Sequence, residues 1–199
     1  MLIKEQLFEI YKGKISIPLH KHEVGKYENI YKESLIYGEI TQLGVELLVS
    51  YLKSKNLFRD VNFLDLGSGN GRLVLHMGLF DEVKSSTGVE IYKSKIDYTE
   101  KIINNLKSYP NEKINLINDD IINIKNFYDY NLIYHNAIAT AGCDELLIKV
   151  SDKIKKGTNV ISTFIFKKHE DYNFDLIGKI SCNYSWMGIN VDSYLYKKR

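Results

Sequence analysis

A glycine-rich turn flanked by two acidic residues is the part of this sequence best suited to chemistry. An apolar run, Phe63-Leu-Asp-Leu66, breaks into Gly67-Ser-Gly-Asn-Gly71, and a second run, Ser86-Thr-Gly-Val-Glu90, ends in an acid 25 residues after Asp65. Glycines let the backbone bend and approach a ligand at points where a Cβ atom would clash. This order of strand, turn, helix and acid-ended strand predicts an α/β site for a cofactor that carries a nucleoside.

The glycine spacing and the position of Asp65 favour S-adenosylmethionine over a dinucleotide. The nicotinamide fingerprint has two residues before its third glycine, whereas one residue separates the last two glycines here. A dinucleotide places its pyrophosphate at the helix N-terminus. S-adenosylmethionine has no phosphate and carries a cationic sulfonium and an amino group, which suit an acid at the turn. We expect Asp65, Gly67 and Gly69 to hold this cofactor and Glu90 to accept hydrogen bonds from both ribose hydroxyls. An ordinary glycine-rich turn with a chance acid downstream is the alternative.

The length and composition predict one globular domain with a short extension. A chain of 199 residues can bury a full hydrophobic core. No apolar run approaches the ~18 residues that a membrane span needs, and the acid-containing N-terminus is not typical of a secretory signal. The two cysteines and five histidines show no metal-binding spacing, and a net charge of +2 does not indicate a polyanionic partner. We therefore expect an intracellular protein with no metal and no membrane contact.

The spacing of apolar residues predicts strands that alternate with helices. Strands are expected at 62–66, 86–90, 114–118, 132–135 and 159–164, and helices at 72–79, 92–106 and 144–154. Residues 177–186 and 191–196 are typical of a hairpin. These elements predict a mostly parallel sheet with one antiparallel strand. The expected fold is the Rossmann-like, seven-stranded class I S-adenosylmethionine-dependent methyltransferase fold with a C-terminal β-hairpin.

The N-terminal part is expected to be an extension, residues 1–36, in front of a catalytic domain at residues 37–199. The extension begins with a short helix whose apolar residues share one side, namely Leu2, Leu7, Ile10 and Tyr11. The domain begins with a helix that Thr41 is placed to cap. The apolar face of that helix is expected to consist of Leu43, Leu47, Leu48, Tyr51 and Leu52.

Two further loops should reach the site, because ligands of such sheets bind at the carboxyl ends of the strands. After residues 114–118 comes Asn118-Asp-Asp-Ile121, where Asp119 or Asp120 can bind the adenine amino group while Ile121 covers the ring. A solvated loop is an equally good interpretation for either acid alone. After residues 132–135 comes Asn136, a polar residue in an apolar run at the place where methyl transfer would occur. A turn-forming asparagine is the alternative there.

Four segments of the chain resemble the disruptor-of-telomeric-silencing (DOT-type, non-SET) histone lysine methyltransferase family. Ile36-Tyr-Gly-Glu-Ile-Thr41 resembles its Tyr-Gly-Glu-Thr loop, and Asp65-Leu-Gly-Ser-Gly-Asn-Gly71 matches its Asp-Leu-Gly-Ser-Gly-x-Gly turn. Tyr134-His-Asn-Ala137 is similar to its asparagine-bearing loop. Ser185-Trp-Met-Gly188, followed by Ser193-Tyr-Leu195, is similar to its closing Ser-Trp-Thr-Gly hairpin. The Tyr-Gly-Glu loop and the hairpin are the most specific of these segments.

The resemblance implies a set of residues around the cofactor beyond the turn itself. Tyr37 and Glu39 would close over its methionine end, and Glu90 would hold its ribose. Asp120 would be the adenine acid, with Ile121 where the family has Phe. Asn136 would also contact the cofactor.

The resemblance implies three catalytic residues, Asn136, Tyr37 and Trp186. Asn136 would help to position the cofactor and the target amine, and Trp186 would line the channel through which the lysine enters. Core packing is the alternative for Tyr37, and for Trp186 packing and channel lining are compatible.

The chain departs from the family's pattern at three places. Arg72 follows the glycine turn where the family usually has Gln, and the loop after Asn136 lacks the family's Phe residues. Ser193 and Tyr194 stand where the family has two consecutive tyrosines, so the channel tyrosine is either missing or replaced by Tyr194. These departures bear on the lysine channel, and so on the substrate, more than on the cofactor site.

The function that the resemblance implies is S-adenosylmethionine-dependent lysine N-methylation of core histone 3, free or in a nucleosome. Lysine must attack as a neutral amine although its free pKa is ~10.4, and a narrow aromatic channel would favour that form by desolvation. A histone substrate implies the nucleus, and any other substrate the cytoplasm. Weak DNA contact through the basic termini (Lys21, Lys26 and 197–199) is an option, although each charge singly is more typical of a solvated surface.

Other functions stay open from the sequence alone. One is methylation of a lysine in a non-histone protein, and another is methylation of nucleic acid. An adenine-amino enzyme usually carries an Asn/Asp-Pro-Pro-aromatic loop where this chain has His-Asn-Ala-Ile, and neither Cys143 nor Cys182 follows a proline as in cytosine-carbon enzymes. A catalytically silent fold that binds a partner is a third alternative, and Asp65, Glu90 and Asn136 argue against it.

Overall fold

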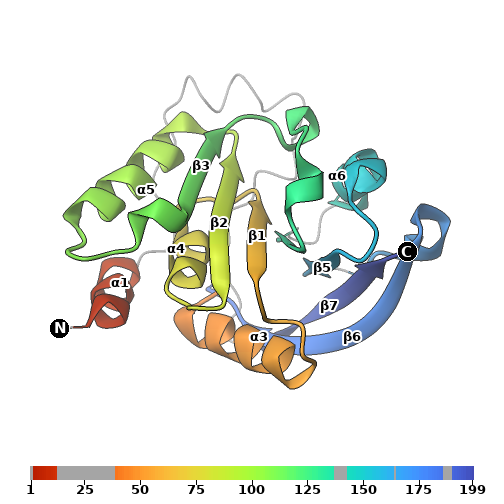
Figure 1. Ribbon diagram of the computed structural model, residues 1–199, viewed down its shortest axis with the longest axis horizontal. Coiled ribbons are helices and arrows are strands. Elements are labelled where there is room, and N and C mark those ends of the chain that lie inside the picture. The colour runs from red at the N-terminus through yellow and green to blue at the C-terminus, as the bar shows by residue number, and fades with distance from the viewer. Residues whose placement is uncertain (1, 13–38, 137–142, 164, 186–189) are drawn as a thin grey trace.

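A seven-stranded sheet forms the centre of the protein, with helices against both faces (Figure 1). The structure is a computed structural model that describes residues 2–12, 39–136, 143–163, 165–185 and 190–199. The strands are β1 (Val61–Leu66), β2 (Val83–Glu90), β3 (Ile114–Asn118), β4 (Leu132–His135), β5 (Asn159–Ser162), β6 (Phe174–Asn183) and β7 (Asn190–Lys198). The described α-helices are α1 (Ile3–Tyr11), α3 (Gln42–Ser54), α4 (Arg72–Gly78), α5 (Lys93–Asn105) and α6 (Cys143–Val150). Short 3-10 helices are η1 (Asn111–Lys113), η2 (Ile121–Asn123), η3 (Phe127–Asp129), η4 (Ser151–Lys153) and η5 (His169–Tyr172).

The sheet has the order β3-β2-β1-β4-β5-β7-β6, with β7 as its single antiparallel strand. Strands β3, β2, β1, β4 and β5 pair in parallel, so their carboxyl ends meet at one edge. The chain passes from one side of β1 to the other at β4, and ligands of open α/β sheets bind at such a reversal. The predicted seven-stranded fold with its C-terminal hairpin is therefore confirmed.

Two apolar layers enclose the sheet because successive side chains of a strand point to opposite faces. Phe63 and Tyr134 belong to the layer beneath α3 and α4, whereas Leu64 and Leu66 belong to the layer beneath α6. Asp65 alternates with these leucines and pairs in register with Tyr134. Its carboxyl group is therefore carried on the α3 and α4 face, near the carboxyl end of β1.

Helix α3 begins as predicted, but it buries a different face. Thr41 Oγ1 accepts a hydrogen bond from Gly44 N at 3.1 Å, which confirms the cap. Leu43 and Leu47 are 54% and 36% exposed, so their predicted burial is wrong. A Cβ atom on Gly44 would stand 2.3 Å from the Asn183 carbonyl oxygen, so the helix presses its glycine side against β6. The buried residues are therefore Gly44, Val45, Leu48, Val49 and Leu52.

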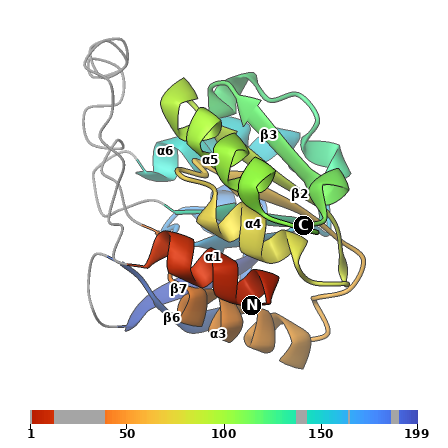
Figure 2. The same ribbon diagram turned by 90° about the vertical axis from the view of Figure 1, so that its left-hand side faces the viewer.

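The N-terminal helix α1 packs on the domain that follows it. It lies beside α4 and α3 (Figure 2). Leu7 is fully buried and Tyr11 nearly so, in a cluster that also contains Leu75 of α4 and Ile102 of α5. Leu2 precedes the helix and is 72% exposed, so its expected place on the buried side is wrong. The described part of the expected extension is thus built into the fold.

The hairpin strands have their Asn183 and Asn190 ends at the carboxyl edge of the sheet, and the chain terminus lies at the opposite edge. Ser162, at the end of β5, pairs with Tyr194, whereas Asn159, at its start, pairs with Lys197. Lys198 is buried and donates to the Tyr172 carbonyl at 2.7 Å. The basic terminus therefore lies away from the cofactor edge, with one of its cations committed to the fold.

Gly71 offers a direct test of how tightly the turn is packed. Its φ is +75°, and a Cβ atom there would lie 2.3 Å from Thr99 Cγ2 of α5. We expect Gly71→Ala to lower the free energy of unfolding by about 2–3 kcal/mol, because a left-handed backbone and a clash act together. Gly157→Ala is the matched control, since Gly157 has φ +89° with nothing within 4 Å of an added Cβ. Urea unfolding should show a smaller loss there, of about 1–2 kcal/mol, and equal losses would contradict the packing explanation.

Candidate active site

Three carboxyl groups meet at the carboxyl ends of β1 and β2, where the sequence predicted a cofactor. Glu39, Asp65 and Glu90 are 7%, 4% and 5% exposed. Removal from water, reinforced by the charges of Glu39 and Glu90, raises the pKa of Asp65 well above its usual value. A ligand that brings positive charge to this edge would reduce that repulsion.

Glu90 holds the glycine turn and the start of α5 together. Its Oε2 accepts a hydrogen bond from Gly69 N at 2.9 Å, and its Oε1 accepts one from Tyr92 N at 2.9 Å. The ammonium of Lys95 lies 4.0 Å from Oε2, and both side chains are buried. Each carboxylate oxygen can accept a second hydrogen bond, so the predicted contact with ribose hydroxyls is compatible with this network.

Glu39 forms a buried ion pair with Arg72. Arg72 Nε lies 3.0 Å from Glu39 Oε2, and the two side chains are 7% and 8% exposed. Arg72 begins α4 directly after the glycine turn. The pair therefore links the Tyr-Gly-Glu segment to the turn that the sequence identified as the cofactor cradle.

The glycine turn leaves open space where a cofactor would lie. Gly67, Gly69 and Gly71 all have positive φ, at 83°, 57° and 75°. A Cβ atom on Gly67 would meet nothing within 4 Å. Gly67 N and Ser68 N both donate to the Val89 carbonyl, which fixes the turn against β2. The open space, the backbone geometry and the three nearby carboxyl groups fit a ligand with a cationic centre and ribose hydroxyls.

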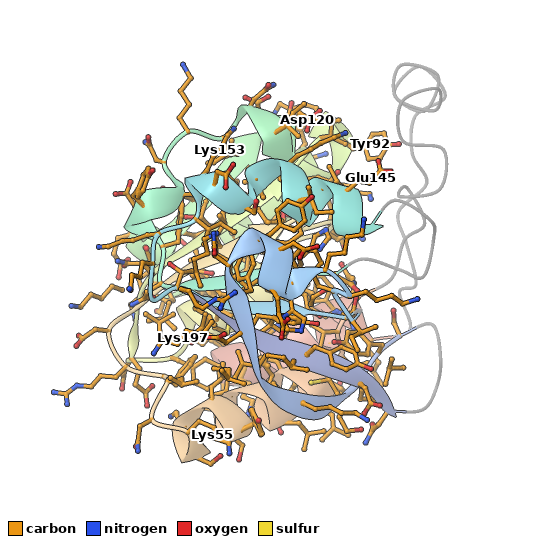
Figure 3. The ribbon with its side chains drawn as sticks, turned by 90° about the vertical axis from the view of Figure 1, so that its right-hand side faces the viewer. Lys55, Tyr92, Asp120, Glu145, Lys153 and Lys197 are labelled. Atoms are coloured by element: carbon orange, nitrogen blue, oxygen red, sulfur yellow. The ribbon has the colours of Figure 1, made fainter. Side chains whose placement is uncertain are left out.

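The loop after β3 uses its two acids differently. Asp119 Oδ1 accepts from Asn123 Nδ2 at 2.8 Å and from Asp120 N at 2.7 Å, and these bonds lower the Asp119 pKa. Asp120 Oδ1 accepts from Ile122 N at 3.0 Å and so caps η2. Figure 3 shows Asp120 and Tyr92 toward the same end of the molecule. Ile121 is half-buried and packs against the apolar layer beneath α6.

Asn136 follows β4 directly and stands at the same edge of the sheet. It is half-buried, and it comes after His135, which pairs in register with Leu66 of β1 and Ser162 of β5. Burial lowers the His135 pKa to about 4. This edge therefore presents a polar amide beside a neutral imidazole, with no cation at that histidine near neutral pH.

The Tyr-Gly-Glu segment and the closing hairpin meet, although they lie far apart in the sequence. Glu39 N donates to Ser185 Oγ at 3.1 Å, and Ser185 N donates to the Glu39 carbonyl at 2.9 Å. Ile40 pairs with Tyr184 in an antiparallel bridge. The juxtaposition is thus built from one bond between the two backbones and one from the Glu39 backbone to the Ser185 hydroxyl. Tyr37 and Trp186, the two predicted catalytic aromatics on these segments, lie outside the described residues.

Ser193 and Tyr194 point to opposite faces of the sheet. Ser193 is fully buried and its hydroxyl bonds the Tyr184 hydroxyl, which also accepts from the Tyr134 hydroxyl at 3.1 Å. Tyr194 packs into the layer beneath α6. Tyr194 therefore does not share the face of Asp65 and Tyr184, which argues against it as the channel tyrosine.

Sequence reasoning missed the two cations that balance the acids. Lys95 lies on the buried side of α5, next to Ile96 and one turn before Thr99. A lysine on the apolar side of that helix is the feature of the sequence that could have indicated its burial. Arg72 departs from the family pattern, but no feature of the sequence indicates that it pairs with Glu39.

Comparison with solved structures places the fold in a known class. A proposed RNA methyltransferase from Pyrococcus horikoshii aligns with a TM-score of 0.66 at 17% identity, over 100% of this chain and 99% of that chain. Magnesium protoporphyrin IX methyltransferase from Synechocystis, solved with bound S-adenosylmethionine, aligns with a TM-score of 0.62 at 11% identity, over 100% and 98%. The tRNA methyltransferase TrmK of B. subtilis aligns with a TM-score of 0.65 at 14% identity, over 81% and 67%. The fold is that of class I S-adenosylmethionine-dependent methyltransferases.

The family follows from the sequence itself. The model of the histone methylation protein DOT1 family matches residues 14–182, so the chain belongs to this family. A search of curated proteins found no match. S-adenosylmethionine is the cofactor of this fold and family, and the open turn with its three carboxyl groups fits it. Within the described ranges no helix is long and apolar enough to cross a bilayer.

Proposed function

We propose that the protein is a lysine N-methyltransferase that uses S-adenosylmethionine and has core histone 3 as its best single target. The observation that carries this proposal is the reciprocal bonding of Glu39 and Ser185. It brings together the two segments that resemble the histone lysine methyltransferase family most specifically. A channel for a lysine side chain would lie between them, beside Asn136.

Specific residues would hold the cofactor in this proposal. Asp65 and Glu39 would face its cationic methionine end, and Glu90 would accept hydrogen bonds from the ribose. Asp120 and Ile121 would bind the adenine, in addition to their part in η2. The cofactor supplies the methyl group on a positively charged sulfur. The acid cluster, which consists of Glu39, Asp65 and Glu90, suits that charge electrostatically.

The chain's own contribution to the reaction would be to orient the amine and keep it neutral. A buried channel disfavours the charged form of lysine and so lowers the pKa of its amine toward the working range. Asn136 would hold the amine by a hydrogen bond, and Tyr37 and Trp186 would exclude water. Positioning of this kind supplies a large part of many enzymatic accelerations. His135 would stay neutral and add no repulsion to an incoming lysine.

Methylation of a non-histone protein lysine is the second candidate, and the basic terminus favours it over a nucleosome-bound enzyme. Lys197 pairs with the start of β5, at the sheet edge opposite the site, and Lys198 is buried. Figure 3 shows Lys197 well away from Asp120 and Tyr92. Arg199 Nε lies 3.5 Å from Asp175 Oδ1. These cations are poorly placed to guide nucleosomal DNA to the site, while Lys21 and Lys26 lie outside the described residues.

One experiment separates these substrates. The protein would be incubated with cofactor labelled on its methyl group and, in parallel, with nucleosomes, free core histones, unrelated lysine-rich proteins, RNA or DNA. Mass spectrometry of the products should find methyl-lysine on core histone 3, with free histone methylated at least as well as nucleosomes. Methyl groups only on RNA or DNA would overturn the lysine assignment. Methyl-lysine only on the unrelated proteins would move the answer to the second candidate.

Asn136 is expected to affect turnover more than cofactor binding. Asn136→Ala should lower kcat by about 10- to 100-fold, because a misplaced amine loses the aligned geometry. Cofactor affinity, measured by calorimetry, should change much less. Asn131→Ala is the matched control, since Asn131 precedes the same strand at its other end and bonds Asn62 N and the Asp60 carbonyl. Full activity of a folded Asn136→Ala protein would remove Asn136 from the active site.

A further inference from the structure

Arg72 connects the acid cluster to the N-terminal helix. Besides its ion pair with Glu39, its Nη2 donates to the Tyr11 carbonyl at 2.9 Å. Its guanidinium carbon lies 4.9 Å from the centre of the Tyr11 ring. One buried side chain therefore meets a carboxylate of the candidate site on one side and the last turn of α1 on the other.

Tyr11 reaches the same region by a second route. Its hydroxyl donates to the Asn70 carbonyl at 2.7 Å, inside the glycine turn. Tyr11 and Leu7 are anchored in the apolar cluster that joins α1 to α4 and α5. The end of α1 is thus held firmly, and it contacts both Arg72 and the backbone of the predicted cofactor cradle.

We propose that Arg72 is a positioning residue for the cofactor, which fixes the Glu39 carboxylate at the edge of the site and takes its own support from α1. The inference rests on the proposed use of S-adenosylmethionine. Arginine suits this task because its planar fork bonds a carboxylate and a carbonyl at once while its face packs on an aromatic ring. A neutral side chain there would leave Glu39 beside Asp65 without that cation, and the carboxylate would be expected to turn away or take up a proton.

A purely structural role for Arg72 is the competing explanation. In that case the residue would stabilise the fold through α1, and its loss would act independently of Glu39. The two explanations differ in one measurable quantity, which is whether the effects of changing Arg72 and Glu39 on cofactor affinity are independent.

The test is a double-mutant cycle read by calorimetric titration with S-adenosylmethionine, and separately with S-adenosylhomocysteine. The variants are Arg72→Gln, Glu39→Gln and the double variant, with Arg72→Lys as the charge-conserving change. Lys4→Ala is the control, because the exposed pair of Lys4 with Glu46, at 2.7 Å, also joins α1 to the domain but lies outside the acid cluster. Unfolding in urea reports stability for each protein independently of binding.

We expect Arg72→Gln to weaken S-adenosylmethionine binding at least about tenfold, with partial recovery in Arg72→Lys. The double variant should bind within about a factor of two of Glu39→Gln, since Arg72 acts through Glu39. Lys4→Ala should bind as the wild type does.

If Arg72→Gln does not fold, Glu39→Gln is compared with the double variant, whose two amides leave no unpaired charge. Independent effects, or a double variant tenfold weaker than Glu39→Gln, would overturn the inference. Failure of the wild type to bind either compound would instead overturn the proposed function.

Discussion

Glu90→Ala is expected to abolish cofactor binding at micromolar concentrations and to weaken the fold at the same time. Its carboxylate accepts hydrogen bonds from Gly69 N and Tyr92 N, each at 2.9 Å, and lies 4.0 Å from the buried Lys95 ammonium. Two lost hydrogen bonds between a charged group and ribose amount to about 3 kcal/mol or more, which is over a hundredfold in affinity. Breaking a buried ion pair by removing one partner lowers the free energy of unfolding by about 3–5 kcal/mol.

The two effects of Glu90→Ala can be measured separately. Calorimetry reports affinity for S-adenosylmethionine, and urea unfolding without ligand reports stability. Asp97→Ala is the control, because it removes a carboxylate from the neighbouring α5 whose pairing with Lys93 is largely exposed. An exposed pair contributes about 1 kcal/mol at most, so that variant should bind normally. Wild-type affinity in a folded Glu90→Ala protein would contradict the assignment of Glu90 to the ribose.

The parts of the site that could be predicted from the sequence are those set by local backbone geometry. The turn from Gly67 to Gly71 needs positive φ at its glycines, and the flanking strands place Asp65 and Glu90 at one edge whatever the rest of the chain does. These requirements act over a few residues, so residue types at fixed spacing reveal them.

The partners of those acids could not be predicted in the same way. Arg72 bonds a carbonyl 61 residues away in the sequence, and Glu39 meets Ser185 across 146 residues. A single Arg at a helix start, such as Arg72, has the same sequence appearance whether it is solvated or buried, because tertiary packing decides. The same reason applies to α3. Its apolar pattern is compatible with Leu43 on the buried face, but the close contact of Gly44 with β6 turns the adjacent face of the helix toward the sheet.

Two buried histidines are expected to make the fold sensitive to mild acid. Burial lowers the pKa of both His76 and His135 from 6.5 to about 4. The unfolded chain therefore binds their protons as the pH falls through about 6.5, while the folded chain binds them only near pH 4, so acid favours unfolding. Each histidine should lower the free energy of unfolding by about 2 kcal/mol between pH 7 and pH 5.

Asp65 acts in the opposite direction and limits the loss. Its raised pKa means that, from about pH 3.9 up to its folded-state pKa, the folded protein holds a proton that the unfolded chain has released. The free energy of unfolding therefore gains from Asp65 as the pH falls through that range, but at most one proton is involved, against two for the histidines. The net free energy of unfolding should still decrease between pH 7 and pH 5.

Urea unfolding at pH 7 and pH 5 tests both directions. His76→Asn keeps a donor toward the Arg72 carbonyl, which His76 Nδ1 meets at 2.8 Å, and cannot titrate. It should reduce the acid-induced loss by about 2 kcal/mol. Asp65→Asn removes the opposing group and should make the loss larger than in the wild type. An unchanged pH dependence in His76→Asn would show that this histidine has the same pKa in the folded and the unfolded protein. An unchanged loss in Asp65→Asn would show that the Asp65 carboxyl is ionised between pH 5 and pH 7 despite its burial beside two other acids.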